Sequence, residues 1–123
     1  MHILLVEDRA DAREVFLESF ERTGARVTAV GSVAGAMETL AREWPDLLVS
    51  DIAMPGEDGY TLIQKVRALE GHRGGRLPAM ALTAYAGADA RARALASGYD
   101  VHVAKPVQPT ELIAAVASLI RGR

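Results

Sequence analysis

The sequence contains no cysteine, which excludes disulfides, thiolate metal sites and thiol catalysis. It also lacks any apolar run close to the roughly 20 residues of a membrane span. Acidic Glu7 and Asp8 interrupt the short apolar stretch that opens the chain, so no signal peptide is expected. The 14 basic and 16 acidic residues nearly balance, so charge-driven binding to nucleic acid or to a membrane is not expected either. These absences favour a cytoplasmic protein.

The composition is that of one globular domain. The chain has 123 residues, of which 50% are apolar and 24% are charged. A chain of this length can build one hydrophobic core but not two ordinary ones. We therefore expect a single domain over residues 1–123.

Short apolar runs alternate with segments of helical periodicity. Strands are predicted at 3–6, 27–30, 47–49, 79–82 and 101–104, because these runs are apolar throughout, and the run at 27–30 is the weakest and suits an edge. Helices are predicted at 12–20, 33–40, 62–69, 88–97 and 109–121, with Gly24, Gly71 and Gly98 ending three of them. The alternation predicts an α/β fold: a doubly wound parallel sheet of five strands flanked by five helices.

Polar residues that suit phosphoryl chemistry stand at the ends of four predicted strands. They are Glu7 and Asp8, Asp51, Thr83, and Lys105. Taken alone, a strand-end Asp is more often a helix cap or a surface residue, Lys105 a solvated surface residue, and Thr83 an ordinary strand residue. In open parallel sheets, however, ligands bind beyond the carboxyl ends of the strands. The coincidence of four such placements indicates a site.

The acidic residues predict a cation site. Glu7, Asp8 and Asp51 would place up to three negative charges close together, which raises carboxylate pKa values unless a cation compensates. Mg²⁺ fits best because it takes oxygen ligands and keeps several waters, and Mn²⁺ could replace it. The acidic pair could also simply begin the first helix, where negative charge suits the helix dipole.

Asp51 is the best candidate nucleophile. Turn residues follow it at 52–56, so its carboxylate is expected to be exposed. Attack on phosphorus would give an acyl phosphate, and catalysis of this step is mostly positioning and charge neutralisation, which the cation and Lys105 would supply. The Thr83 hydroxyl would donate to a phosphoryl oxygen, and Ala84 beside it is too small to block access. Thr83, Ala84 and Lys105 are thus the predicted phosphoryl-binding residues.

Together these segments resemble the receiver domains of two-component response regulators, including those of hybrid histidine kinases. The matching segments are 4–8, 50–55, 58–59, 82–84 and 103–106. The resemblance implies a flavodoxin-like fold with strand order 2-1-3-4-5 and a cis bond before Pro106. It also implies that Asp8, Asp51 and the Ala53 carbonyl bind Mg²⁺ directly, with Glu7 acting through water.

The resemblance implies a function in a phosphorelay. A phosphohistidine on a histidine kinase or a histidine phosphotransfer domain would phosphorylate Asp51. Thr83 would then move toward the phosphoryl group, shifting the loop 84–87 and the surface around His102, which a downstream protein or an attached output domain would read. The isolated domain would be no enzyme beyond its own phosphorylation and slow dephosphorylation. A receiver cut from a hybrid histidine kinase is favoured over one that stands alone.

Several alternatives stay open at this point. In the family that the sequence resembles, many members carry a switch Tyr or Phe at the position of His102. An ordinary strand histidine is an equal alternative to a switch residue here. A metal-dependent phosphohydrolase would need a general acid, commonly an Asp two residues past the nucleophile, where Ala53 stands. A module that is never phosphorylated would not need Asp51, Thr83 and Lys105 together. Dinucleotide binding is disfavoured because no Gly-x-Gly-x-x-Gly follows the first predicted strand.

Overall fold

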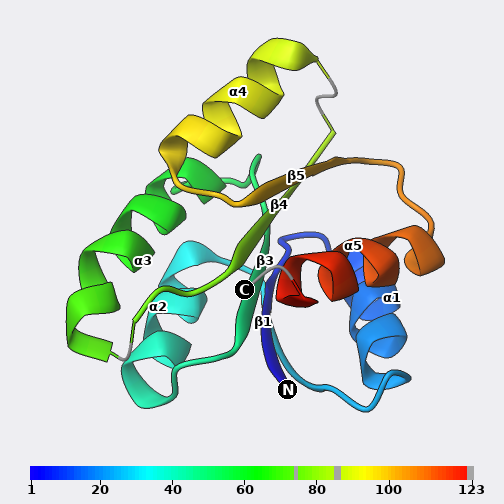
Figure 1. Cartoon of the computed structure of the whole chain (residues 1–123), viewed down its shortest axis with the longest axis horizontal. Helices are drawn as coiled ribbons and strands as arrows, with labels where there is room; N and C mark the ends of the chain where they lie inside the picture. Colours follow the sequence, from blue (N-terminus) through cyan, green and yellow to red (C-terminus); the bar gives the residue numbers. More distant parts are fainter. Residues whose placement is uncertain (74, 85–86, 122–123) are drawn as a thin grey trace.

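Strands and helices alternate along the whole chain (Figure 1). In this computed structural model, residues 1–73, 75–84 and 87–121 are described. The strands are β1 (His2–Val6), β2 (Arg26–Val30), β3 (Leu47–Asp51), β4 (Ala79–Thr83) and β5 (Val101–Ala104). The helices are α1 (Ala10–Glu21), α2 (Val33–Arg42), α3 (Gly59–Arg73), α4 (Ala88–Ser97) and α5 (Pro109–Arg121). Every predicted strand and helix is present, with ends shifted by a few residues.

The five strands form one parallel sheet in the order β2-β1-β3-β4-β5, as predicted. The chain runs from β1 outward to β2 and then crosses back to β3 on the other side of β1. In the register of the sheet, Val6 pairs with Ser50, and Asp51 pairs with Leu82. The carboxyl ends of β1, β3 and β4 therefore lie next to one another, at the point where ligands bind in sheets of this kind.

Helices cover both faces of the sheet. Helices α1 and α5 lie on one face, and α2, α3 and α4 lie on the other (Figure 1). Successive strand residues point to opposite faces. Leu4 and Val6 thus belong to the core shared with α2, α3 and α4, whereas Ile3 and Leu5 belong to the core shared with α1 and α5. Because both faces are covered, β1 is apolar at every position from Ile3 to Val6.

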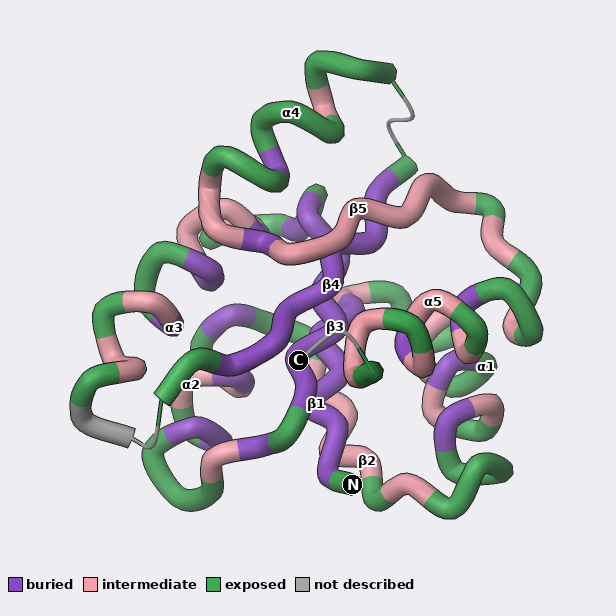
Figure 2. Tube along the Cα trace, in the orientation of Figure 1, coloured by how far each residue is buried: buried purple, intermediate pink, exposed green. Residues whose placement is uncertain are grey.

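Burial distinguishes the central strands from the edges (Figure 2). Every residue of β1, β3 and β4 is buried. Strand β5 is half-buried, and so is β2 except for exposed Arg26. The weakest predicted strand, at 27–30, is indeed an edge strand. Among the residues described, no helix is both long and apolar enough to cross a membrane.

Local sequence explains several helix ends. The Ser32 side chain accepts a hydrogen bond from the Gly35 N–H and caps α2. Gly24 and Gly98 follow α1 and α4 with φ angles of 91° and 125°, which glycine adopts more readily than any other residue.

The prediction that Gly71 ends a helix is wrong. Helix α3 continues through Gly71 to Arg73. A helix tolerates a single glycine at a cost of about 1 kcal/mol, so the residue alone does not stop it. Gly75, with a φ of 100°, takes up the left-handed conformation instead.

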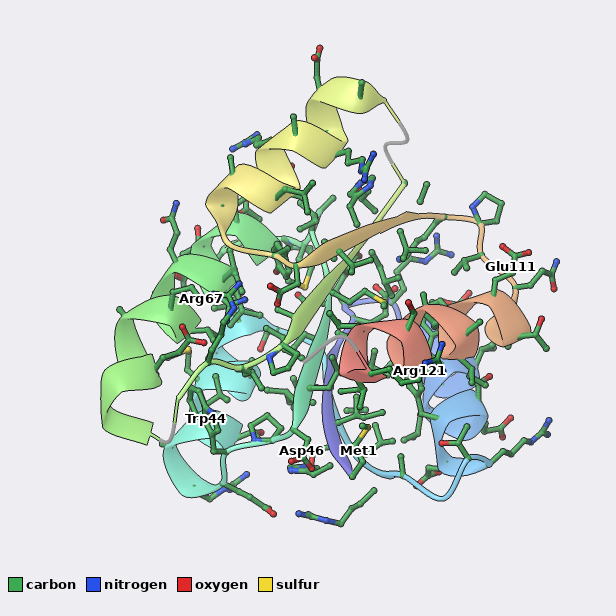
Figure 3. All side chains as sticks on the ribbon, viewed as in Figure 1. Met1, Trp44, Asp46, Arg67, Glu111 and Arg121 are labelled. Carbon is green, nitrogen blue, oxygen red and sulfur yellow. The ribbon has the colours of Figure 1, made fainter. Side chains whose placement is uncertain are left out.

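A polar network joins α3 to the strands that follow it. Figure 3 shows Arg67 reaching from α3 toward the sheet. Its guanidinium donates to the Leu77 carbonyl at 2.5 Å and to the Gly98 carbonyl at 2.6 Å, and it pairs with Glu70 and Asp100. These contacts hold the junction between α4 and β5 against α3.

Candidate functional site

The predicted site residues converge at the carboxyl end of the sheet. Glu7 and Asp8 follow β1, Asp51 ends β3, Thr83 ends β4, and Lys105 follows β5. Each of the three acidic side chains offers one oxygen, and these oxygens lie within 4.8 Å of one another. The acidic cluster expected from the strand ends is therefore present.

The Asp51 carboxylate is buried, so the expectation of an exposed side chain is wrong. Asp51 is 5% exposed and Glu7 is fully buried, while Asp8 is half-buried. The cause is its place at the end of a central strand, with Glu7 and Lys105 beside it. The N–H of Ile52 donates to Asp51 Oδ1 at 2.9 Å. The buried carboxylate thus has polar neighbours in Glu7, Lys105 and the Ile52 N–H.

Burial and the neighbouring Glu7 carboxylate raise the pKa of Asp51 from 3.8 to about 7. The Lys105 ammonium and the Ile52 N–H lower this pKa, but they offset only part of the increase. Without a cation, ionisation of Asp51 therefore destabilises the folded protein. A divalent cation at the cluster would remove this penalty.

Lys105 contacts both buried carboxylates. Its Nζ lies 2.5 Å from Glu7 Oε1 and 3.5 Å from Asp51 Oδ2. The backbone N–H of Lys105 donates to the Thr83 carbonyl at 2.7 Å, which extends the pairing of β4 and β5 by one residue. The bond before Pro106 is cis, as the resemblance implied. The ammonium is thus within reach of any group added to Asp51.

Thr83 and Ala84 lie on the strand next to Asp51. Leu82 pairs with Asp51, and Thr83 follows it as a buried residue. Ala84 is exposed just beyond the strand. The loop predicted to move, 84–87, includes residues 85 and 86, which lie outside the described residues.

His102 lies on β5 beside α4. It lines a groove of about 670 Å³ together with Arg91, Leu95 and Ala104. Its Nε2 is buried and has no hydrogen-bond partner in the part of the chain that the structure describes. Leu95 is 38% exposed at the same groove. A shift of α4 relative to β5 would therefore change the surroundings of His102. His102 does not touch the acidic cluster in any described contact.

The donor set fits a hard divalent cation. The acidic cluster supplies carboxylate oxygens, and Ala53, exposed two residues after Asp51, carries the carbonyl that the resemblance assigns as a ligand. Oxygen ligands completed by water suit Mg²⁺. A cleft of about 400 Å³ lined by Ala53, Tyr60 and Arg93 opens next to this position. Solvent and small molecules thus have access to the Ala53 side of the site.

Sequence reasoning missed Arg13. It lies on α1, and its Nη1 donates to the Glu7 carbonyl at 2.8 Å and reaches the Asp8 carbonyl at 3.4 Å. An arginine in a mixed-charge helix gives no signal of such a contact. The direction of the Arg13 side chain depends on the residue at which α1 begins. The sequence does not give that residue precisely enough to predict that the side chain points back toward Glu7 and Asp8.

Tyr99 was missed as well. Its buried hydroxyl donates to the Gly59 carbonyl at 2.7 Å and so joins the start of β5 to the start of α3. Gly59 itself allows the loop after β3 to close tightly. A Cβ at this position would lie 2.5 Å from the Asp51 carbonyl oxygen, which is too close for any other residue. This gives a physical reason for glycine at the end of the 58–59 segment.

Comparison with known proteins identifies the family. Residues 3–117 match the response regulator receiver domain family. The chain is 48% identical over 113 residues to an uncharacterized 14.6 kDa protein of Leptolyngbya boryana, covering 92% of this chain and 85% of that protein. It is 35% identical to the response regulator protein FleR of Pseudomonas aeruginosa, covering 98% of this chain and 25% of FleR. It is 32% identical to hybrid signal transduction histidine kinase D of Dictyostelium discoideum, covering 98% of this chain but 8% of the kinase.

Solved structures agree with these matches. The signal receiver domain of a signal transduction histidine kinase from Syntrophus aciditrophicus is 30% identical with a TM-score of 0.86, covering 98% of this chain and 90% of that one. The non-phosphorylated HemR receiver domain from Leptospira biflexa is 29% identical with a TM-score of 0.85, covering 97% and 93%. The chain spans most of the Leptolyngbya boryana protein but only a small part of FleR and of the hybrid kinase. The activities of the remaining parts of those longer proteins are not attributed to this chain. The chain belongs to the response regulator receiver domains of two-component signal transduction.

Proposed function

We propose that residues 1–123 form one receiver unit that accepts a phosphoryl group on Asp51 in the presence of Mg²⁺. The observation that carries this proposal is the meeting of three acidic side chains from two strand ends within 4.8 Å, with a lysine ammonium beside them. Repulsion among these carboxylates and their burial destabilise the folded protein unless a cation binds. Buried charge that is unfavourable to folding is typical of functional sites.

The chemistry follows from the orientation of the Asp51 carboxylate. One oxygen accepts the Ile52 N–H at 2.9 Å, and the other faces Lys105 at 3.5 Å. A carboxylate oxygen would form a bond to phosphorus while the bond from phosphorus to the imidazole nitrogen of a phosphohistidine breaks, and the departing imidazole would take up a proton. Bound Mg²⁺ would supply charge neutralisation and a point of attachment for the phosphoryl oxygens.

The residues around Asp51 take separate parts in this proposal. Glu7, Asp8, Asp51 and the Ala53 carbonyl would hold the cation. Lys105, Thr83 and Ala84 would bind the phosphoryl oxygens. Phosphorylation replaces one negative charge on Asp51 by about two. Lys105, which lies closer to Glu7 than to Asp51 in the unphosphorylated protein, would shift toward the new charge.

Receiver domains interact with histidine kinases and with output domains, and we propose the same two classes of partner here. The phosphoryl donor would be a histidine kinase or a histidine phosphotransfer domain. The reader would be a downstream protein or an attached output domain that contacts the groove between α4 and β5, at His102 and Leu95. Full reversal of a 1:99 equilibrium would need about 5.5 kcal/mol of differential binding, so we expect phosphorylation to shift the population only partly.

Acetyl phosphate provides the test. The protein is incubated with Mg²⁺ and acetyl phosphate, and its intact mass is recorded beside Asp51→Asn and a matched control, Asp11→Asn, which removes an exposed carboxylate from α1. We expect one phosphoryl adduct in the wild type and in Asp11→Asn, and none in Asp51→Asn or with EDTA. An adduct that persists in Asp51→Asn would refute the assignment, and turnover of many phosphomonoesters would instead indicate a phosphohydrolase.

A further inference from the structure

The turn between β1 and α1, residues 7–9, carries two of the three acidic side chains and is held by an arginine from α1. We propose that Arg13 is a positioning residue that keeps Glu7 and Asp8 in the geometry that binds the cation. This inference rests on the proposed function, because it assigns a task to Arg13 at the same site. Arg13 does not itself contact the carboxylates in any described interaction.

The contacts show how the turn is held. The Glu7 N–H donates to the Val30 carbonyl on β2 at 3.0 Å. On the other side of the same residue, the Glu7 carbonyl accepts Arg13 Nη1 at 2.8 Å, and the Asp8 carbonyl lies 3.4 Å from the same nitrogen. Glu7 is thus fixed through its N–H by the sheet and through its carbonyl by α1.

Lys105 holds the Glu7 side chain, but other side chains give the backbone of this turn little support. The residue before α1, Arg9, makes no side-chain hydrogen bond that caps the helix. Its backbone N–H reaches Glu7 Oε2 only at 3.4 Å. Among the residues that the structure describes, the Arg13 guanidinium is therefore the main side-chain support for the backbone of the acidic pair.

A glycine from another element borders the space that this guanidinium occupies. Gly31 directly follows β2, and a Cβ at this position would lie 3.0 Å from Arg13 Nη1 and 3.9 Å from the Glu7 carbonyl oxygen. A larger residue would press on the end of the arginine side chain. The half-buried guanidinium thus occupies a space bounded by α1, β2 and the acidic turn.

Positioning and simple charge predict opposite results, which makes the inference testable. Arg13 carries a positive charge near a cation site, so by Coulomb's law alone its removal would strengthen Mg²⁺ binding. If its task is to hold the two carbonyls, removal lets the turn move and weakens Mg²⁺ binding. Loss of a group that orients metal ligands typically lowers metal affinity by about 10- to 100-fold.

The test compares Arg13→Met with Arg9→Met. Arg9 lies in the same turn, but its side chain is 70% exposed and pairs with Asp11, so its removal takes away the same charge without releasing a carbonyl. The Mg²⁺ dissociation constant is measured by calorimetry, and amide hydrogen exchange of residues 7–9 is measured on the metal-free protein. We expect Arg13→Met to raise the dissociation constant roughly tenfold or more and to speed exchange. Arg9→Met should stay within about twofold of the wild type in both.

Each outcome bears on one proposal. Unchanged exchange in Arg13→Met, or Mg²⁺ binding as tight as in the wild type, would overturn the positioning role while leaving the proposed function intact. A wild-type protein that does not bind Mg²⁺ would overturn the proposed function. If Arg13→Met fails to fold, Arg13→Lys replaces it, because lysine keeps the charge but its side chain is one atom shorter, so we expect it to lose at least one of the two carbonyls. Faster exchange in that variant supports the role, and wild-type exchange overturns it.

Discussion

Replacing Asp51 by Asn should stabilise the metal-free protein at alkaline pH. In the wild type this carboxylate is 5% exposed and lies beside the fully buried Glu7, and both features raise its pKa to about 7. Asn keeps the shape of the side chain, and its oxygen can still accept the Ile52 N–H. The substitution therefore removes the unfavourable charge and retains the hydrogen bond.

The size of the gain follows from proton linkage. The pKa of Asp51 is 3.8 in an unperturbed chain and about 7 in the folded protein. This difference of about 3 pKa units, at about 1.4 kcal/mol each, corresponds to at most about 4 kcal/mol. Because the folded value is the higher one, the stability linked to Asp51 is complete below pH 3.8 and is lost as the pH rises toward 7. The advantage of Asn should thus be near zero at pH 4 and largest at pH 8.

Urea unfolding in EDTA at pH 4, 5 and 8 measures this difference. Asp11→Asn serves as the control, because Asp11 is exposed and a hydrogen bond from the Ala12 N–H holds its pKa below the usual value, so its loss should give no gain. Adding Mg²⁺ should stabilise the wild type and leave Asp51→Asn largely unaffected. If Asp51→Asn were no more stable than the wild type at pH 8 in EDTA, the reasoning from burial and repulsion would be refuted.

Three other substitutions test the surroundings of the site by urea unfolding. Tyr99→Phe removes the hydroxyl that donates to the Gly59 carbonyl at 2.7 Å and should cost about 1 kcal/mol, with a wild-type free energy of unfolding as the contrary result. Gly59→Ala places a methyl group 2.5 Å from the Asp51 carbonyl oxygen and should cost about 1–3 kcal/mol. A wild-type free energy of unfolding in this variant would mean that the loop after β3 can move to make room for the methyl group. Lys105→Met removes the ammonium that pairs with the buried Glu7 side chain and should cost about 3 kcal/mol at pH 8 in EDTA, whereas an unchanged free energy of unfolding would show that this ion pair does not stabilise the fold.

The fold could be predicted because its physical signals are local. Strands such as 47–49 and 79–82 are covered on both faces, so they are apolar without interruption. In the intervening helices, apolar residues recur every three or four positions. The meeting of Asp51 with Glu7 and Lys105 was also predictable, since parallel strands present their carboxyl ends at one edge.

Features that depend on how separate segments close against one another could not be predicted. The burial of Asp51 follows from the packing of Glu7 and Lys105 around it, which strand ends alone do not reveal. The contact of Arg13 with the acidic turn depends on the rotational phase of α1 and on the space beside Gly31. The bond from Tyr99 to Gly59 joins residues 40 positions apart, with no pattern in the sequence to connect them.

Reduction with borohydride provides the most direct measurement of where the phosphoryl group is attached. Borohydride converts an aspartyl phosphate to homoserine, and peptide mass spectrometry then locates the altered residue. After treatment with Mg²⁺ and acetyl phosphate, we predict homoserine at position 51 and at no other aspartate, and none when EDTA replaces Mg²⁺. A phosphorylated protein in which Asp51 is unaltered and another side chain carries the change would contradict the proposal that Asp51 is the phosphoacceptor.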